Sequence, residues 1–479
     1  MNYRMIGYLL GVIMTIEAAL LLAPTMVSVI YKESTVPFLI TIAALLIIGL
    51  PLMLFKPKNT RIYAKEGFIC VASSWILLSA FGALPFVLSG TIPHYVDAFF
   101  ETVSGFTTTG ATILSAIEGL PYGILFWRSF THWIGGMGVL VFMLAILPST
   151  DGRAIHLLRA EVPGPTKGKL VPRLKQTALI LYGIYVFLTL AETIALCIAG
   201  LPFYDALVSS FATTGTGGFA LKNASIAGYS KPAAEWIIAI FMFLCGVNFN
   251  LYYFLLMRRF RDIWKSEELR AYILICIAST VLIAVNTYHM ASGLDKCIRD
   301  AFFQVSSIIS TTGFSTLDYN AWPEFSKAVL VLLTMIGACA GSTAGGIKIS
   351  RLLILAKNGM REIKHILRPR SVNVTRLDGE PLSDETCRTA SNYFVLYLGL
   401  IVGTTLLLAL DGFDLTTNLT ATLACINNVG PGLNVVGPIG NFSAFSIFSK
   451  IILSLDMLLG RLEIMPMLIL FSPTAWRKR

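Results

Sequence analysis

Four short stretches of the chain combine a glycine with hydroxyl or amide side chains, and none of them contains an acidic residue. They are Thr108-Thr109-Gly110-Ala111, Thr216-Gly217-Gly218-Phe219, Thr311-Thr312-Gly313-Phe314 and Asn428-Val429-Gly430-Pro431. Their oxygens are mainly backbone carbonyls and hydroxyls, which can replace the hydration shell of a monovalent cation, whereas calcium or sodium pores more often carry acidic rings. Because potassium loses its water more readily than sodium, the stretches predict a K⁺ site. The expected ligands are Thr108, Thr109, Thr216, Gly217, Thr311, Thr312, Asn428 and Val429.

The spacing of these stretches indicates an internal repeat. An aspartate precedes the glycine by 13 positions in three of them (Asp97, Asp205 and Asp300), and Thr417 takes the same place in the fourth. Such residues are good N-caps, so we expect short helices at 97–110, 205–218, 300–313 and 417–430, each ended by its glycine. Four unrelated threonine–glycine turns are the alternative, but coincidence explains the equal spacings poorly.

Long apolar segments surround the short ones. Of the 479 residues, 55% are hydrophobic and only 13% are charged, which excludes a soluble and a disordered protein. Ten segments are long enough to span a bilayer. They are 6–31, 36–55, 67–90, 123–147, 175–200, 232–257, 270–290, 325–357, 388–411 and 444–472. The four short segments cannot span and are expected to be re-entrant half-helices.

Basic residues predict the orientation in the membrane. The net charge is +10, and most of the 37 lysines and arginines lie in loops on one side of the predicted spans. Cytoplasmic loops carry such an excess, so an even number of spans places both termini in the cytoplasm. The half-helices then enter from outside. The same distribution argues against nucleic-acid binding, because the charges flank apolar runs instead of forming a patch.

The predicted fold is an all-α integral membrane protein in which four M1–pore helix–M2 pseudo-repeats surround one pore. We expect a two-helix N-terminal extension at 1–60 and repeats at 61–165, 166–265, 266–375 and 376–479. Each half-helix would direct the negative end of its dipole toward the common axis, which favours a cation there.

A glycine cluster interrupts the predicted span at 325–357. It consists of Gly337, Gly341, Gly345 and Gly346, followed by Lys348. Small residues in a spanning helix can serve close helix packing. They can also mark a non-helical segment, which is tolerated at this depth where it lines a water-filled cavity. The neighbouring Lys348 favours the second interpretation, a loop below the filter.

Arg461 lies inside the last predicted span. A charged side chain at this depth faces the interior of the bundle by default and is a functional candidate. On the axis it would raise the barrier to a passing cation. The alternative is a structural ion pair with Asp456 or Glu463.

The fourfold repeat with one glycine in each loop resembles the TrkH/Ktr/Trk superfamily of K⁺ transporters over the whole chain. The two extra N-terminal helices and the NNVGPG stretch of the fourth loop are most similar to its TrkH/TrkG branch. The resemblance implies a K⁺-channel-like pore within one subunit, a homodimer, and regulation by a cytoplasmic nucleotide-binding subunit of the TrkA (RCK) kind. It also implies a gate formed by Arg461, the glycine-rich loop and Lys348.

In the same resemblance, each loop glycine corresponds to the first glycine of the TVGYG filter of K⁺ channels. The next residue here is Ala111, Phe219, Phe314 or Pro431, and only the fourth loop has a second glycine, Gly432. A shorter ladder of carbonyls follows, because fewer fixed oxygens define the site. We therefore expect weaker discrimination of K⁺ from Rb⁺ or Na⁺ than in a true K⁺ channel.

The predicted function is potassium uptake across the bacterial inner membrane, with K⁺ as substrate and no covalently bound cofactor. A K⁺/H⁺ or K⁺/Na⁺ symporter, or a Na⁺ carrier, on the same fold is the alternative. Coupling would need an intramembrane carboxylate, and the candidates are Glu17, Asp456 and Glu463. An enzyme is disfavoured, because the eight cysteines and five histidines are dispersed and form no catalytic dyad or metal-binding spacing.

Overall fold

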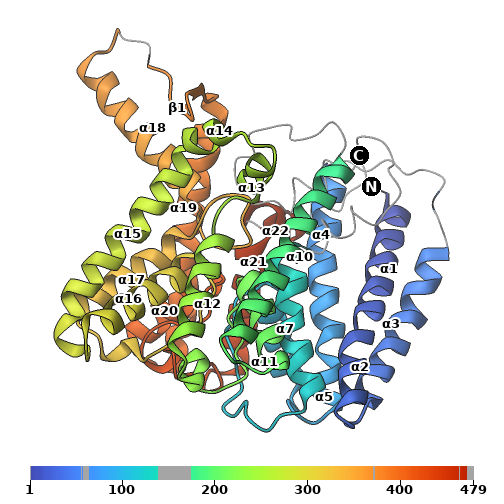
Figure 1. Ribbon diagram of the computed structural model, residues 1–479. Helices are drawn as coiled ribbons and strands as arrows, with labels where there is room; N and C mark the ends of the chain where they lie inside the picture. The colour runs from blue at the N-terminus through green and yellow to red at the C-terminus, as the bar shows by residue number, and fades with distance from the viewer. Residues whose placement is uncertain are drawn as a thin grey trace.

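The computed structural model describes residues 2–54, 57, 64–138, 174–370, 373–462 and 464–471. Within these residues the regular structure is helical, apart from one antiparallel hairpin of β1 (Arg376–Leu377) and β2 (Glu380–Pro381), in which Arg376 pairs with Pro381. The predicted all-α membrane fold is confirmed (Figure 1).

The helices follow an order that recurs along the chain. Three N-terminal helices come first: α1 (Tyr3–Leu20), α2 (Leu22–Ile30) and α3 (Val36–Leu54). The next group is α4 (Ala64–Gly82), α5 (Leu84–Leu88), the short α6 (Tyr95–Phe106) and α7 (Tyr122–Gly136). It is followed by α10 (Leu174–Ile198), the short α11 (Phe203–Thr214), the 3-10 turn η1 (Ser225–Tyr229), α12 (Pro232–Cys245) and α13 (Phe249–Leu256).

The second half of the chain repeats this order. Its first group is α14 (Phe260–Lys265), α15 (Glu267–Thr287), η2 (Tyr288–Met290), the short α16 (Leu294–Ile309), η3 (Tyr319–Ala321), α17 (Glu324–Ile336) and α18 (Ile349–Leu367). Its last group is α19 (Asp384–Leu408), η4 (Ala409–Asp411), the short α20 (Leu415–Ile426), η5 (Asn434–Val436), α21 (Ile447–Arg461) and α22 (Ile464–Phe471).

The predicted spans correspond to these helices with some breaks. Six described helical stretches are long and apolar enough to cross a bilayer: Tyr3–Ile30, Val36–Leu54, Lys65–Leu88, Ala178–Ile198, Glu267–Met290 and Asp384–Asp411. The other four predicted spans contain α7, the α12–α13 pair, α17 with the first part of α18, and α21 with α22. The predicted span at 123–147 is described only up to residue 138, so the rest of it lies outside the described residues.

The spanning helix predicted at 232–257 is not continuous. The chain bends by 91° between α12 and α13. Gly246 stands at the bend, where a side chain would collide with the Tyr272 hydroxyl of α15. Asn248 then caps α13 by accepting a hydrogen bond from the amide of Asn250 (3.0 Å). Hydropathy alone does not detect this break, because the two asparagines near it are outnumbered by apolar residues over the length of a span.

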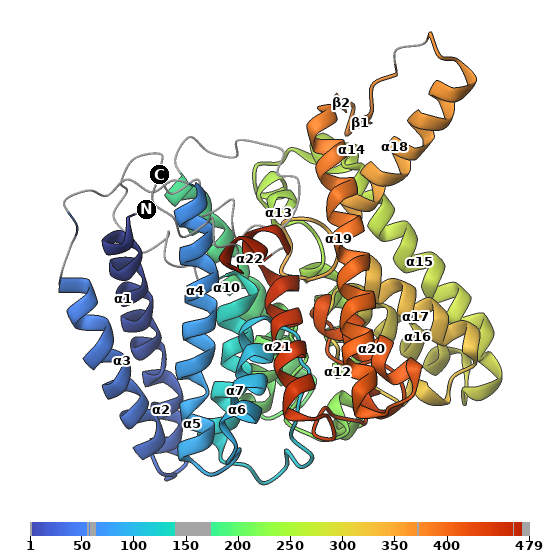
Figure 2. The same ribbon diagram turned by 180° about the vertical axis from the view of Figure 1, so that it is seen from behind.

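The four groups pack in a closed order. The helix that follows each short helix lies against the short helix of the next group: α7 against α11, α12 against α16, α17 against α20 and α21 against α6. The short helices α6, α11, α16 and α20 therefore surround one centre. Figure 1 and Figure 2 show them in the half of the molecule opposite to the end from which α18 and the hairpin project.

Candidate functional site

The short helices begin earlier than predicted. Their N-caps are His94, Pro202, Gly293 and Asp414. The prediction that Asp97, Asp205, Asp300 and Thr417 are N-caps is therefore wrong. Three of them occupy the third helical position, where an acidic residue also complements the helix dipole, so spacing alone cannot separate the two positions. Asp97 pairs there with Lys450 of α21 (2.7 Å), and Thr417 donates its amide to Asp414 (3.1 Å).

All four short helices end in the same way. The first loop residue takes a left-handed conformation with φ between 55° and 57°; these residues are Thr108, Thr216, Thr311 and Asn428. In the first loop, the Thr108 amide donates to the Gly105 carbonyl (3.1 Å) and the Thr109 amide to the Ser104 carbonyl (2.9 Å), and the other three loops repeat this pattern. This Schellman motif satisfies carbonyls at the helix end and turns the chain sharply.

Threonine is an unusual left-handed residue. Its branched side chain is strained there, at a cost of about 1–2 kcal/mol, and glycine is the common choice. Strain kept at three equivalent positions points to a function for the hydroxyl groups. The Thr311 hydroxyl accepts a hydrogen bond from the Gly345 amide (2.7 Å), and the Thr108 hydroxyl is buried without a hydrogen-bond partner among the described residues.

The loop glycines close a ring. A methyl group at Gly110 would collide with the carbonyl oxygen of Gly217, one at Gly218 with that of Thr312, one at Gly313 with that of Val429, and one at Gly430 with that of Thr109. Four carbonyl oxygens and four glycines thus alternate around one centre. The Asn428 amide joins the ends of this order by donating to the Thr109 hydroxyl (3.0 Å), across 319 positions of sequence. The structure therefore brings all four predicted stretches together.

A cavity opens on one side of this carbonyl ring. It is lined by the ring glycines and by residues that follow them in each loop, among them Ala111, Phe219 and Pro431. The left-handed residues that precede the glycines face the other way. The ring therefore has an open side and a side occupied by the ends of the short helices.

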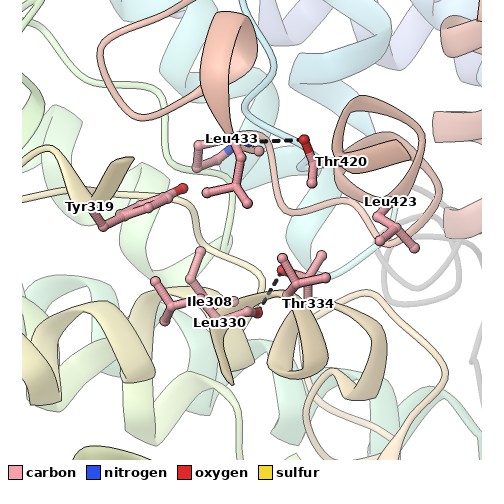
Figure 3. A pocket seen from close by; sticks show the side chains of 10 residues that line it. Ile308, Tyr319, Leu330, Thr334, Thr420, Leu423 and Leu433 are labelled. Atoms are coloured by element: carbon pink, nitrogen blue, oxygen red, sulfur yellow. Dashed lines mark hydrogen bonds between the residues drawn. The ribbon is translucent and has the colours of Figure 1, made fainter. Parts of the chain in front are cut away.

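A second, smaller cavity lies beside the fourth loop and outside the ring (Figure 3). Apolar side chains such as Ile308, Leu330 and Leu433 line it. Its threonines already have backbone partners, since Thr420 accepts from the Leu433 amide (3.0 Å) and Thr334 donates to the Leu330 carbonyl (3.1 Å). This cavity offers a cation no free oxygen cluster, so the carbonyl ring is the candidate site.

The glycine-rich segment 337–348 is non-helical and covers the helix-end side of the ring. Gly337, Gly341 and Gly346 have φ between 69° and 79°. The Gly345 amide reaches Thr311, and a side chain at Gly345 would collide with the Asn427 carbonyl. The predicted interruption of the helix is thus present, and it lies directly against the third and fourth loops.

The bend between α12 and α13 receives the same segment. The Cys339 amide donates to the Gly246 carbonyl (3.1 Å), and the Phe249 amide donates to the Gly341 carbonyl (2.9 Å). Lys348, which is 1% exposed, turns its ammonium group back to the Ala344 carbonyl within the segment. The backbone groups freed by one broken helix are therefore satisfied by the other, as buried non-helical backbone requires.

Arg461 joins this arrangement through backbone carbonyls. Its guanidinium donates to Thr343 of the segment (2.7 Å) and to Gly135 and Gly136 at the end of α7 (2.6 and 2.9 Å). The alternative pair with Asp456 is not formed, since the Asp456 carboxylate accepts from Thr404 of α19 (3.2 Å). Glu463 lies outside the described residues. Arg461 therefore bridges the glycine-rich segment and α7 with its positive charge.

Two residues of α7 that were not predicted as site residues support the second loop. Arg128 is buried, pairs with Glu101 (2.7 Å), donates to the Ala220 carbonyl (3.0 Å) and stacks on the Phe219 ring. His132 is 2.7 Å from the Gly105 carbonyl through Nδ1 and accepts from the Phe219 amide through Nε2 (3.3 Å). Its ring fills the space that a side chain at residue 217 would need. Apolar helices with single polar residues gave no signal for these contacts.

Three buried carboxylates lie behind the short helices. Glu17 of α1, Glu192 of α10 and Asp456 of α21 are each at most 2% exposed. Neither oxygen of Glu17 or Glu192 has a hydrogen-bond partner among the described residues. Glu192 is missing from the carboxylates predicted from the sequence, because a single acid in a long apolar helix forms no pattern. The set of possible coupling sites is therefore larger than predicted.

Comparison with known families and proteins identifies the family of this chain. The family model TrkH, with the description cation transport protein, matches residues 34–478. The chain belongs to the TrkH family. The range of the TrkH match includes the carbonyl ring, the glycine-rich segment and Arg461, so the chain is a multi-pass membrane protein of a cation-transport family.

Relatives within the TrkH family are similar over their full length. The Trk system potassium uptake protein TrkH of Escherichia coli (strain K12) is 38% identical over 491 residues, and that of Salmonella typhimurium is 37% identical over 492, with all of each chain covered. The crystal structure of the potassium transporter TrkH from Vibrio parahaemolyticus matches with a TM-score of 0.88 at 33% identity and covers 100% of both chains.

Proposed function

We propose that the chain takes up potassium and that the carbonyl ring is its selectivity filter. The observation that carries the proposal is the closure of the ring, in which each loop presents one carbonyl to the glycine of its neighbour. The ends of four short helices meet there, and their dipoles favour a positive charge. The ligands are the carbonyls and hydroxyls of the four loops, which are neutral and therefore suit a monovalent cation.

The filter selects K⁺ less strictly than a longer carbonyl ladder would. Ala111, Phe219, Phe314 and Pro431 follow the ring glycines, and Ala111, Phe219 and Pro431 border the open cavity. Few fixed oxygens extend the site in that direction. Rb⁺ then passes with K⁺, and Na⁺ passes more slowly.

The glycine-rich segment and Arg461 form the gate on the other side of the ring. The segment lies against Thr311 and Asn427, and Arg461 adds a positive charge beside it. A cation leaving the filter meets both. Opening requires the segment to move and the guanidinium contacts to change.

The projecting end of the molecule faces the cytoplasm of a bacterial inner membrane. Arg361, Lys364 and Arg368 of α18 and its cap lie there, beside the exposed apolar residues Ile363 and Ile366. Positive charge at this end follows the positive-inside rule, and we infer that both termini lie on the same side. This end suits a TrkA-type regulatory subunit, and two copies of the chain form a homodimer.

A coupled transporter on the same fold is the second candidate. The buried carboxylates of Glu17, Glu192 and Asp456 favour it, because intramembrane acids mark proton pathways in pumps and transporters. They lie behind the short helices and not in the ring itself. Conduction down the membrane potential therefore remains the first proposal.

Cation flux in proteoliposomes tests both candidates. With the membrane potential set independently, we expect K⁺ and Rb⁺ to enter at similar rates, and Na⁺ about tenfold more slowly, the effect of about 1.4 kcal/mol. With K⁺ as the only permeant metal cation, the current should reverse at the K⁺ equilibrium potential at every pH. K⁺ flux that requires a proton or sodium gradient at a fixed membrane potential would establish coupled transport. Equal K⁺ and Na⁺ flux would contradict the filter.

Substitution of His132 tests the support of the second loop. In His132→Ala the Phe219 amide loses its acceptor and Gly217 gains space, so the loop carbonyls become mobile. We expect the K⁺/Na⁺ flux ratio to fall about fivefold, the effect of about 1 kcal/mol. His132→Asn, which keeps a donor and an acceptor, serves as the matched control and should retain more of the ratio. An unchanged ratio in folded His132→Ala would exclude this role.

A further inference from the structure

Glu268 contacts both ends of the glycine-rich segment. It lies in the first turn of α15, is 8% exposed, and its Oε1 atom accepts hydrogen bonds from the Ala340 amide (2.7 Å) and the Ser350 amide (3.0 Å). Ala340 belongs to the segment, and Ser350 belongs to the first turn of α18, which follows it. One carboxylate oxygen therefore joins the chain before and after the covering residues.

The two hydrogen bonds that the Glu268 carboxylate accepts are expected to be strong. Hydrogen bonds to an ionised acceptor are about twice as strong as those between neutral groups. A carboxylate at the N-terminus of α18 also complements the positive end of that helix. The segment is thus held at its base by charge as well as by geometry.

Other contacts hold the middle of the segment. Thr311 binds Gly345, and Arg461 binds Thr343. Thr311 and Arg461 both belong to elements at the ring, so the loss of either contact would also affect the filter. Glu268 holds the base from α15, which is not part of the ring. Loss of Glu268 would therefore free the segment without touching a ring residue.

The residue next to Glu268 contacts a different part of the molecule. The Glu267 carboxylate pairs with Lys357 of α18, and its amide donates to Asp378 in the turn of the β-hairpin (2.8 Å). The two adjacent acidic residues at the start of α15 thus have different partners. Glu267 contacts the projecting end, and Glu268 contacts the segment. This makes Glu267 a matched control of equal charge and near-identical position.

We propose that Glu268 is the positioning residue that holds the glycine-rich segment across the ion path, so that its release opens the gate. The proposal rests on the proposed function, because it takes the segment to be the gate. It adds a residue on α15 to the gate, outside the ring and apart from Arg461. Movement of α15 against α18 then changes the segment through this one side chain.

Flux measurements on three variants test the proposal. In proteoliposomes, Glu268→Ala should raise Rb⁺ flux at least about tenfold, because the loss of even one hydrogen bond to a charged group has an effect of that size. Glu268→Gln, which keeps an acceptor oxygen, should give a smaller increase. Glu267→Gln should stay within about twofold of the wild type, because its half-buried pair with Lys357 lies at the projecting end and not at the segment. The K⁺/Na⁺ flux ratio should not change in any of them.

Alkylation of native cysteines gives a readout that does not depend on flux. Cys339 lies in the segment and Cys425 in α20, and both are fully buried. In Glu268→Ala a membrane-permeant maleimide should label Cys339 about tenfold faster, as expected for local opening. Labelling of Cys425 should not change, and it reports general unfolding.

The outcomes separate the two proposals. Unchanged flux together with unchanged Cys339 labelling in Glu268→Ala would overturn the role of Glu268. A fallen K⁺/Na⁺ ratio would also overturn it, since the residue would then act through the filter. Faster Cys339 labelling with unchanged flux would show that Glu268 holds the segment but that the segment is not the gate, which overturns the proposal as stated. A wild-type protein that conducts K⁺ and Na⁺ equally would instead contradict the proposed filter.

Discussion

Replacing Gly313 by alanine should abolish selective potassium flux and leave the protein folded in the membrane. Gly313 has φ of 85°, and a methyl group there would collide with the Val429 carbonyl of the next loop. The left-handed conformation alone costs an alanine about 1–2 kcal/mol. The collision adds to this cost and must displace a ring carbonyl. We expect K⁺ uptake to fall at least about a hundredfold, or the K⁺/Na⁺ ratio to fall to about one.

A glycine elsewhere supplies the control for this substitution. Gly399 lies in α19 with ordinary helical dihedral angles and no atom near its missing side chain. Gly399→Ala should keep transport and should stabilise the helix by about 0.5–1 kcal/mol. Rubidium and sodium uptake into vesicles with matched protein content would compare the two variants. Wild-type selectivity in Gly313→Ala would show that the carbonyl ring is not the filter.

Replacing Arg461 by alanine should raise potassium flux. A cation passing within about 8 Å of the guanidinium would be repelled by about 2 kcal/mol at an effective dielectric constant of about 20. Removal of that barrier corresponds to about thirtyfold in rate. The same substitution frees the Thr343 carbonyl, so the segment also becomes mobile. Single-channel recording would show both effects, as a larger unitary current and a longer open time.

Arg461→Lys separates the charge from the hydrogen bonds. Lysine keeps the positive charge but lacks the planar fork that reaches Thr343 and the two glycines of α7 together. If the charge forms the barrier, the unitary current of Arg461→Lys should stay close to the wild-type value while its open time rises. Unchanged flux in a folded Arg461→Ala protein would remove the barrier.

Glu268 and Arg461 hold the same segment from different sides, so their effects should not add. Once Glu268→Ala has released the base of the segment, the loss of the Thr343 contact should increase the mobility of the segment less than it does in the wild type. Contacts that share one mobile element show such coupling, typically 0.5–3 kcal/mol. The charge contribution of Arg461 to the unitary current should persist in the double variant.

The local sequence was enough to predict where the helices and the four loops lie. Apolar segment length located the spans, because a bilayer demands it whatever the packing. The equal spacing from Asp97 to Gly110 and its three counterparts located the short helices, although it misplaced their starts by three residues or more. The ring glycine of each loop was recognisable, because no other residue type combines a left-handed backbone with close approach.

Tertiary structure alone decided which groups meet. The bend at Gly246, the contact of Glu268 with Ala340 and Ser350, and the place of His132 behind Gly217 all join segments that are far apart in the sequence. The partners of Arg461 are backbone carbonyls, which every residue carries, so no pattern of side chains could have identified them. Hydropathy and residue spacing depend only on a single segment and the solvent around it. The ring and its cover depend on how four such segments pack against one another.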